Sequence, residues 1–171
     1  MDLIKLKIPA EFIGERASLS WSEARFGIVN ELLDPSAAID LAAEKVAVLE
    51  HPPAVLVELA GAEKDEPTQG LVDQLADSEP PPPEKEVRNK WLYLVLAWVY
   101  EHRDSYPDPL QIVEEVYADF GYPKQISGFV RYMPMEGPDL GSRDANQQRL
   151  FERWKKYLEE TATSMTRAAS S

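Results

Sequence analysis

The stretch Trp91–Tyr100, WLYLVLAWVY, decides the fold, because every one of its residues is apolar or aromatic. Its periodicity alone fits either a buried strand or a fully buried helix. No glycine or proline occurs between Glu84 and Tyr106, and the residues that precede Trp91 are good helix formers. A run of about 20 residues without a breaker is too long for an ordinary strand. We therefore predict a buried central helix, whose apolar part is far shorter than the ~20 residues that cross a bilayer.

The composition is that of a globular protein with a strong excess of acid. The chain has 171 residues and a net charge of -12, and 44% of its residues are hydrophobic. This charge repels nucleic-acid phosphates and anionic lipids, so we expect no nucleic acid and no membrane as a ligand. It favours a basic protein partner through electrostatic steering.

Cysteine is absent, which excludes disulfides, thiolate metal sites and a cysteine nucleophile. The first residues, MDLIKLKI, show neither a long apolar segment nor a small-residue cleavage site. We therefore expect a cytoplasmic protein.

Helix-start signals recur along the chain. Ser20 and Glu23 have the spacing of a capping box. Asp34 and Asp108 each precede a proline, which is the pattern of an N-cap followed by proline at the first helical position. After the capping box, apolar residues follow at helical spacing at positions 26, 29, 32 and 33. Gly61 is expected to end a short helix in the left-handed conformation.

These signals predict an all-α fold of about eight helices, arranged as an irregular orthogonal bundle or a small helical array. We expect residues 1–171 to form a single domain. Residues 4–8 are predicted to be an extended arm packed on the first helices, and residues 9–19 to be irregular. The proline-rich segment 78–83 is expected to be a surface connection, and residues 162–171 a flexible tail.

The sequence contains no motif that brings catalytic chemistry. His51 and His102 lack the spacing of metal ligands, and no glycine pattern matches a phosphate-binding loop. Adjacent acidic residues on a helix point about 100° apart and make poor acid/base pairs. We therefore predict no metal, no cofactor and no catalytic residue.

Two surfaces are candidates for binding a partner. Arg131, Tyr132 and Met135 lie beside a loop rich in glycine and proline, and their composition is typical of interfaces. The alternative is that neighbouring apolar residues are core and that Arg131 pairs with a local acid. The second surface is an acid-rich strip that could mimic a polyanion to a basic partner, although simple solubility is the favoured interpretation. Its members are Glu58, Glu63, Asp65, Glu66, Asp73 and Asp77.

Two stretches resemble a family of small bacterial proteins known only as a domain of unknown function. They are VEEVYADFGYP at residues 113–123 and FVRYMP at residues 129–134, with shorter similarities at 19–21, 142–146 and 154–158. The resemblance covers most of the chain, although the proline-rich segment and the N-terminal arm depart from it. It implies an all-helical bacterial protein and brings no catalytic residues. Small acidic families of this kind often occur beside toxin genes as immunity proteins.

We therefore expect a non-catalytic protein that binds another protein, with neutralisation of a basic bacterial toxin as the specific hypothesis. One alternative is an enzyme or small-ligand-binding protein with a site near Arg131 and His102. Another is a structural scaffold or homodimer. The sequence does not choose the oligomeric state.

Overall fold

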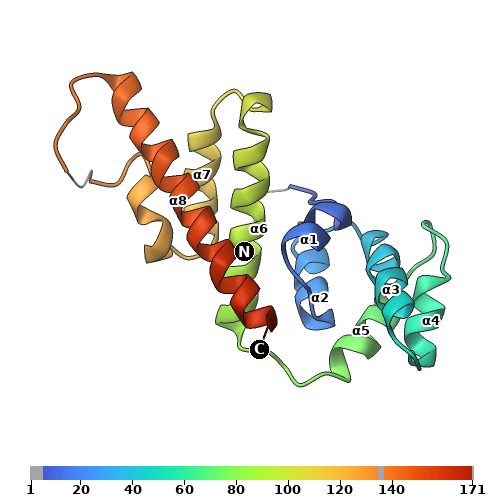
Figure 1. The fold of residues 1–171 in the computed structure, drawn as a ribbon. Coiled ribbons are helices and arrows are strands. Elements are labelled where there is room, and N and C mark those ends of the chain that lie inside the picture. The colour runs from blue at the N-terminus through green and yellow to red at the C-terminus, as the bar shows by residue number, and fades with distance from the viewer. Residues whose placement is uncertain (1–5, 135–136, 171) are drawn as a thin grey trace. The chain divides into compact units, whose positions relative to one another are not determined.

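The computed structural model describes residues 6–134 and 137–170, and the side chains up to residue 165 (Figure 1). Within these residues the secondary structure consists of eight α-helices and two 3-10 helices, with no strand. The prediction of an all-α fold is confirmed. No helix in the described part of the chain is long and apolar enough to cross a membrane.

The chain divides into two compact units, and the division falls between Trp91 and Leu92, inside the helix α6 (Glu84–Glu101). We call residues 6–91 the N-terminal unit and residues 92–170 the C-terminal unit. The proline-rich segment 78–83 lies inside the N-terminal unit and does not mark the division. The prediction of a single domain stays a prediction. The helices of the N-terminal unit are α1 (Ala10–Arg16), α2 (Trp21–Val29), α3 (Ala37–Val48), α4 (Ala54–Ala60), α5 (Gln69–Asp77) and the first part of α6 (Glu84–Glu101).

The N-terminal unit is built from pairs of packed helices. α3 packs against α4 and α1, and α5 packs against α2 and α4. Ser20 caps α2 as predicted: its Oγ accepts from the Glu23 amide at 3.2 Å, and Glu23 Oε1 accepts from the Ser20 amide at 2.9 Å. The core is made of apolar side chains that are fully buried, among them Ile13, Leu32, Leu33, Ala38, Leu59 and Val72.

Three local predictions in this unit were wrong. The segment 9–19, predicted to be irregular, contains α1, which has no side-chain cap and is stabilised by burial of Ala10, Phe12 and Ile13. Asp34 does not cap α3, because it accepts from the amide and hydroxyl of Ser36 in a turn instead. Gly61 has φ -91° and is therefore not left-handed.

Residues 6–8 of the predicted N-terminal arm lie within the described part of the chain. Ile8 is buried, and its amide donates to the Leu32 carbonyl at 2.8 Å. Residues 4 and 5 of the predicted arm lie outside the described residues.

The C-terminal unit contains the rest of α6, η1 (Arg103–Ser105), α7 (Pro109–Asp119), η2 (Lys124–Phe129) and α8 (Arg143–Ser170). The apolar run of α6 is buried as predicted, with Leu94, Val95, Leu96 and Val99 completely inaccessible to solvent. α8 packs against η2. α8 continues to Ser170, so the backbone of residues 162–170 is helical; their flexibility stays a prediction.

Candidate functional site

Arg131 sits at the centre of an ion-pair network in the C-terminal unit. Its Nη1 and Nη2 donate to Oδ1 and Oδ2 of Asp108 at 3.2 and 3.0 Å, and its Nε donates to Glu114 Oε1 at 3.0 Å. Arg131 pairs with acids, as in the expected alternative, but its partners lie 17 and 23 positions away in the sequence and are not local. We call these three residues the arginine triad. It ties the segment after η2 to the N-terminal half of α7.

The hydrogen bonds of the arginine triad set its electrostatics. Donation from Arg131 is the main cause that lowers the pKa of Asp108. The bonds to Asp108 and then to Glu114 raise the pKa of Arg131. Because the charged forms stabilise one another, the triad keeps two carboxylates and one guanidinium together, with a net charge of about -1.

Three tyrosines form a cluster beside the triad. Tyr117 on α7 is buried, whereas Tyr122 is 61% and Tyr132 55% exposed. The ring of Tyr117 meets the ring of Tyr122 edge to face at 5.3 Å and the tilted ring of Tyr132 at 6.0 Å between centroids. We call these three residues the tyrosine face. It exposes two large aromatic side chains that rest on a third, buried one.

The C-terminal end of α7 holds Tyr122 in place through a Schellman motif. The Tyr122 amide donates to the Tyr117 carbonyl at 2.8 Å, and the Gly121 amide donates to the Ala118 carbonyl at 3.1 Å. Gly121 has φ +79°, and Tyr122 itself has φ +60°. A tyrosine rarely adopts a positive φ. The two backbone bonds and the contact with Tyr117 therefore hold the ring of Tyr122 in a defined position.

The sequence singled out Arg131 and Tyr132 and missed Tyr117 and Tyr122. The only signal for the missed pair was the stretch that resembles the bacterial family, since it contains both tyrosines. Met135 lies outside the described residues.

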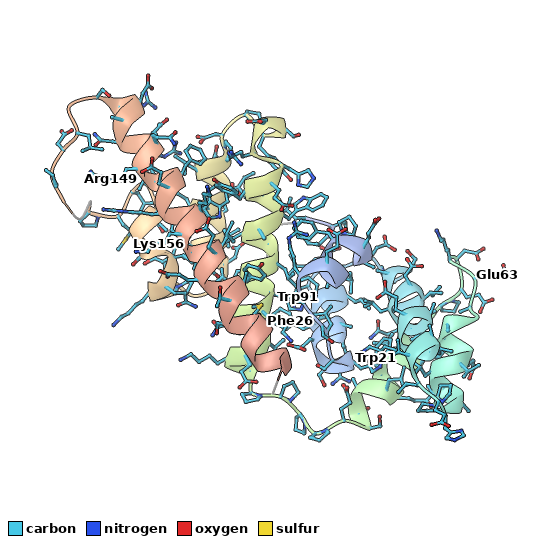
Figure 2. The ribbon with its side chains drawn as sticks, viewed as in Figure 1. Trp21, Phe26, Glu63, Trp91, Arg149 and Lys156 are labelled. Carbon is cyan, nitrogen blue, oxygen red and sulfur yellow. The ribbon has the colours of Figure 1, made fainter. Side chains whose placement is uncertain are left out.

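The acidic candidates belong to the N-terminal unit. Glu63, Asp65 and Glu66 are exposed in the loop between α4 and α5, where Figure 2 shows Glu63. Asp73 accepts from Gln69 at 3.0 Å and lies 3.7 Å from Arg25. Arg25 therefore offsets part of the charge of Asp73, while the loop acids face solvent. Among the described residues, no group of acids and histidines is arranged to hold a metal ion.

An enzymatic or small-ligand site near Arg131 and His102 stays a prediction. The guanidinium of Arg131 already faces two carboxylates. The ring of His102 stacks on Trp98 with centroids 3.8 Å apart, and its Nδ1 is 2.8 Å from the Trp98 carbonyl. His102 is therefore held at the C-terminal end of α6 by its own helix.

A groove of about 650 Å³ lies between the end of α6, η1 and α8. Half-buried rings of Tyr100, Tyr106 and Phe151 line it. The guanidinium of Arg103 lies 4.2 Å from the centroid of the Tyr100 ring, and Lys155 is on the opposite helix. The sequence could not indicate this groove, because its residues are scattered over four elements and share no motif.

A family model described as "Uncharacterized protein conserved in bacteria (DUF2247)" matches residues 10–162. This match confirms the resemblance drawn from the sequence. No curated protein and no solved structure matches the chain.

Proposed function

Because the chain belongs to this uncharacterised bacterial family, we propose a function from its own surface: it binds another protein through the tyrosine face. The observation that carries the proposal is the exposure of Tyr122 and Tyr132 on a buried tyrosine. Tyrosine is enriched in interfaces because it offers a large apolar ring, a polar tip and few rotatable bonds.

Rigidity of this surface supports the proposal. The Schellman motif fixes Tyr122, and the arginine triad fixes the segment in which Tyr132 follows Arg131. A partner that meets side chains already held in place loses less conformational entropy on binding. The tyrosine face therefore needs little rearrangement to become an interface.

Charge supports a basic partner. Residues 6–91 carry 17 acidic and 8 basic side chains, and residues 92–171 carry 12 and 9. Such an excess accelerates association with a positively charged protein, most of all at low salt. Neutralisation of a basic bacterial toxin is the specific form of the proposal, and this charge is the feature that supports it.

The test compares variants in a capture experiment from lysate of the native bacterium. The bait proteins are the wild type, Tyr122→Ser/Tyr132→Ser, and the control Val29→Ser/Val57→Ser, which removes two exposed apolar residues from the other unit. We expect at least one protein to be retained by the wild type and the control and lost from the tyrosine variant. Recovery of the same proteins in equal amounts by all three baits would contradict the proposal. A melting curve of each bait establishes that it is folded.

The toxin hypothesis has its own test. A basic protein encoded beside this gene is expressed in a host with and without the chain. We expect growth arrest that the wild type relieves and the tyrosine variant does not. Arrest that persists with the wild type, while the two proteins are both present, would contradict the toxin hypothesis and leave protein binding standing.

The groove between α6, η1 and α8 favours a second candidate, a protein that binds a small molecule. Its aromatic lining and charged rim suit a planar ligand that bears a charge. A metabolite screen by melting temperature, with Phe151→Asp as the comparison, tests this candidate. A metabolite that raises the melting temperature of the wild type alone would support it, and the absence of any such metabolite would count against it.

A further inference from the structure

We infer that the tyrosine face accepts an arginine side chain of its partner, which lies against the exposed rings of Tyr122 and Tyr132. This inference rests on the proposed function and names the chemistry of the contact. The face of an aromatic ring carries partial negative charge and attracts a cation within about 6 Å of its centre. Two such rings share one surface here, because both pack on Tyr117.

The surroundings of the rings favour a positive ligand over a negative one. α7 carries Glu114, Glu115 and Asp119 and has no basic side chain. Its C-terminal end, from which Tyr122 follows, also carries the negative end of the helix dipole. Arg131 is paired with two carboxylates and leaves the triad with net negative charge, and Lys124, two positions after Tyr122, is an exposed cation of η2. Binding of an anion at the tyrosine face would therefore be electrostatically unfavourable.

Glu114 lies close enough to the tyrosines to act on their charge. The pKa of Tyr132 is raised, first by desolvation and then by the nearby Tyr117, Tyr122 and Glu114. Desolvation opposes a charge of either sign, whereas the negative charge of Glu114 opposes a phenolate and favours a cation. The carboxylate and the rings therefore act on an incoming positive group together.

Arginine suits the surface better than lysine. The guanidinium is planar, is weakly hydrated and stacks on rings, whereas the ammonium is compact and strongly hydrated. The described residues include two arginine contacts of this kind, and Lys45 makes a longer one, 5.8 Å from the ring centroid of Trp21. Arg16 lies 3.8 Å from the ring centroid of Phe12, and Arg103 lies 4.2 Å from that of Tyr100.

The experiment titrates the full-length, isotope-labelled protein with three capped tripeptides and follows its amide spectrum. The probes are acetyl-Gly-Arg-Gly-amide, its lysine analogue and its citrulline analogue, which keeps the shape of arginine and removes the charge. We expect the arginine peptide to perturb the amides around residues 122 and 132 and to bind about 2–5-fold more tightly than the citrulline peptide, as expected of an exposed cation–π contact. Equal affinity for both peptides, or no perturbation at these amides, would overturn the inference.

Two variants of Tyr132 distinguish the contribution of the aromatic ring from that of apolar contact alone. Tyr132→Phe keeps the aromatic ring and is expected to retain the preference for arginine, while Tyr132→Leu loses it. Leu140→Ala, which alters an exposed apolar residue of the same unit outside the groove and the tyrosine face, is the control and is expected to behave as the wild type. A Tyr132→Leu protein that keeps the full preference contradicts the inference.

This result is independent of the capture experiment. If the tyrosine variant loses its captured protein but the arginine peptide does not bind, protein binding stands and the arginine contact fails. If the peptide binds as expected but capture does not depend on the tyrosines, the arginine site stands and the proposed function fails.

Discussion

The indole of Trp91 lies directly over Gly27, so that a Cβ atom placed at Gly27 would come within 2.2 Å of Cζ2 of Trp91. One turn earlier on α2, the Glu23 carbonyl accepts a hydrogen bond of 2.8 Å from Nε1 of the same indole. Trp91 is completely buried. Because Gly27 has no side chain, the indole can approach the backbone of α2, where the Glu23 carbonyl binds its Nε1. These two features allow the first part of α6 to pack on α2.

Substitution of Gly27 by alanine is expected to destabilise the protein. The added methyl group meets a rigid ring, and overpacking of this kind costs about 1–3 kcal/mol. Gly70→Ala is the control, because nothing lies within 4 Å of a Cβ atom at that position on α5. There, the higher helix propensity of alanine is expected to stabilise the protein by up to ~1 kcal/mol. Urea unfolding followed by tryptophan fluorescence measures both, and a Gly27→Ala protein as stable as the wild type would contradict the packing described.

Lys90 supports the same region through the carboxylate of Glu23. Glu23 is only 5% exposed, and its Oε2 lies 2.8 Å from Lys90 Nζ. Lys90→Met leaves that charge buried with fewer partners, which is expected to lower the free energy of unfolding by about 1–3 kcal/mol. Lys156→Met is the control, because its pair with Glu160 is largely exposed at 3.9 Å and is expected to contribute less than ~1 kcal/mol. Urea unfolding that shows equal losses for both variants would rule out the buried pair as a stabilising contact.

The features predicted correctly are those decided within one turn of chain. The capping box at Ser20 and Glu23 and the cap at Asp108 depend only on side chains three residues apart, and the structure confirms both. The burial of the central helix follows from an apolar run with no polar residue to expose. The predicted N-cap at Asp34 was wrong, because the Asp34 carboxylate instead accepts hydrogen bonds from Ser36 in a local turn.

Features that depend on contacts distant in sequence could not be predicted. Apolar spacing predicted that residues 29, 32 and 33 share the buried face of one helix, yet Val29 is 67% exposed. The reason is that α2 ends at Val29 and that Glu31, which has a positive φ, changes the direction of the chain. The tyrosine face and the arginine triad likewise join residues from α7 and from the segment after η2. Arg131 and Asp108 are 23 positions apart, and no spacing rule connects them.

The arginine triad predicts a dependence of stability on pH. A carboxyl whose folded pKa lies below its unfolded value stabilises the fold above the unfolded pKa, and this stabilisation is lost as the pH falls through the folded pKa. The pKa of Asp108 is lowered from 3.8, chiefly by the hydrogen bond from Arg131. Asp108→Asn keeps an acceptor for the helix cap and removes the charge. We expect the wild type to exceed this variant in free energy of unfolding at pH 6 and the difference to shrink toward pH 2.

Urea unfolding at pH 6, 4 and 2 measures this difference. The control is Asp104→Asn, which alters an exposed acid on the neighbouring η1 without touching Arg131. A difference between wild type and Asp108→Asn that is constant over the whole pH range would show that the charge of Asp108 contributes nothing through the triad.

The position of Tyr122 depends on Gly121. Its φ of +79° is unfavourable for any residue with a Cβ atom, but a Cβ atom here would have no neighbour within 4 Å. Gly121→Ala is therefore expected to cost about 1 kcal/mol through backbone strain alone. Gly128→Ala is the matched control: its Cβ atom also meets nothing within 4 Å and its φ is not positive. Urea unfolding compares the two, and equal stability would mean that the left-handed turn does not hold Tyr122. If the left-handed turn does hold Tyr122 in position, Gly121→Ala is also expected to weaken retention of the captured partner. The reason is that relief of the backbone strain moves the ring of Tyr122 away from Tyr117.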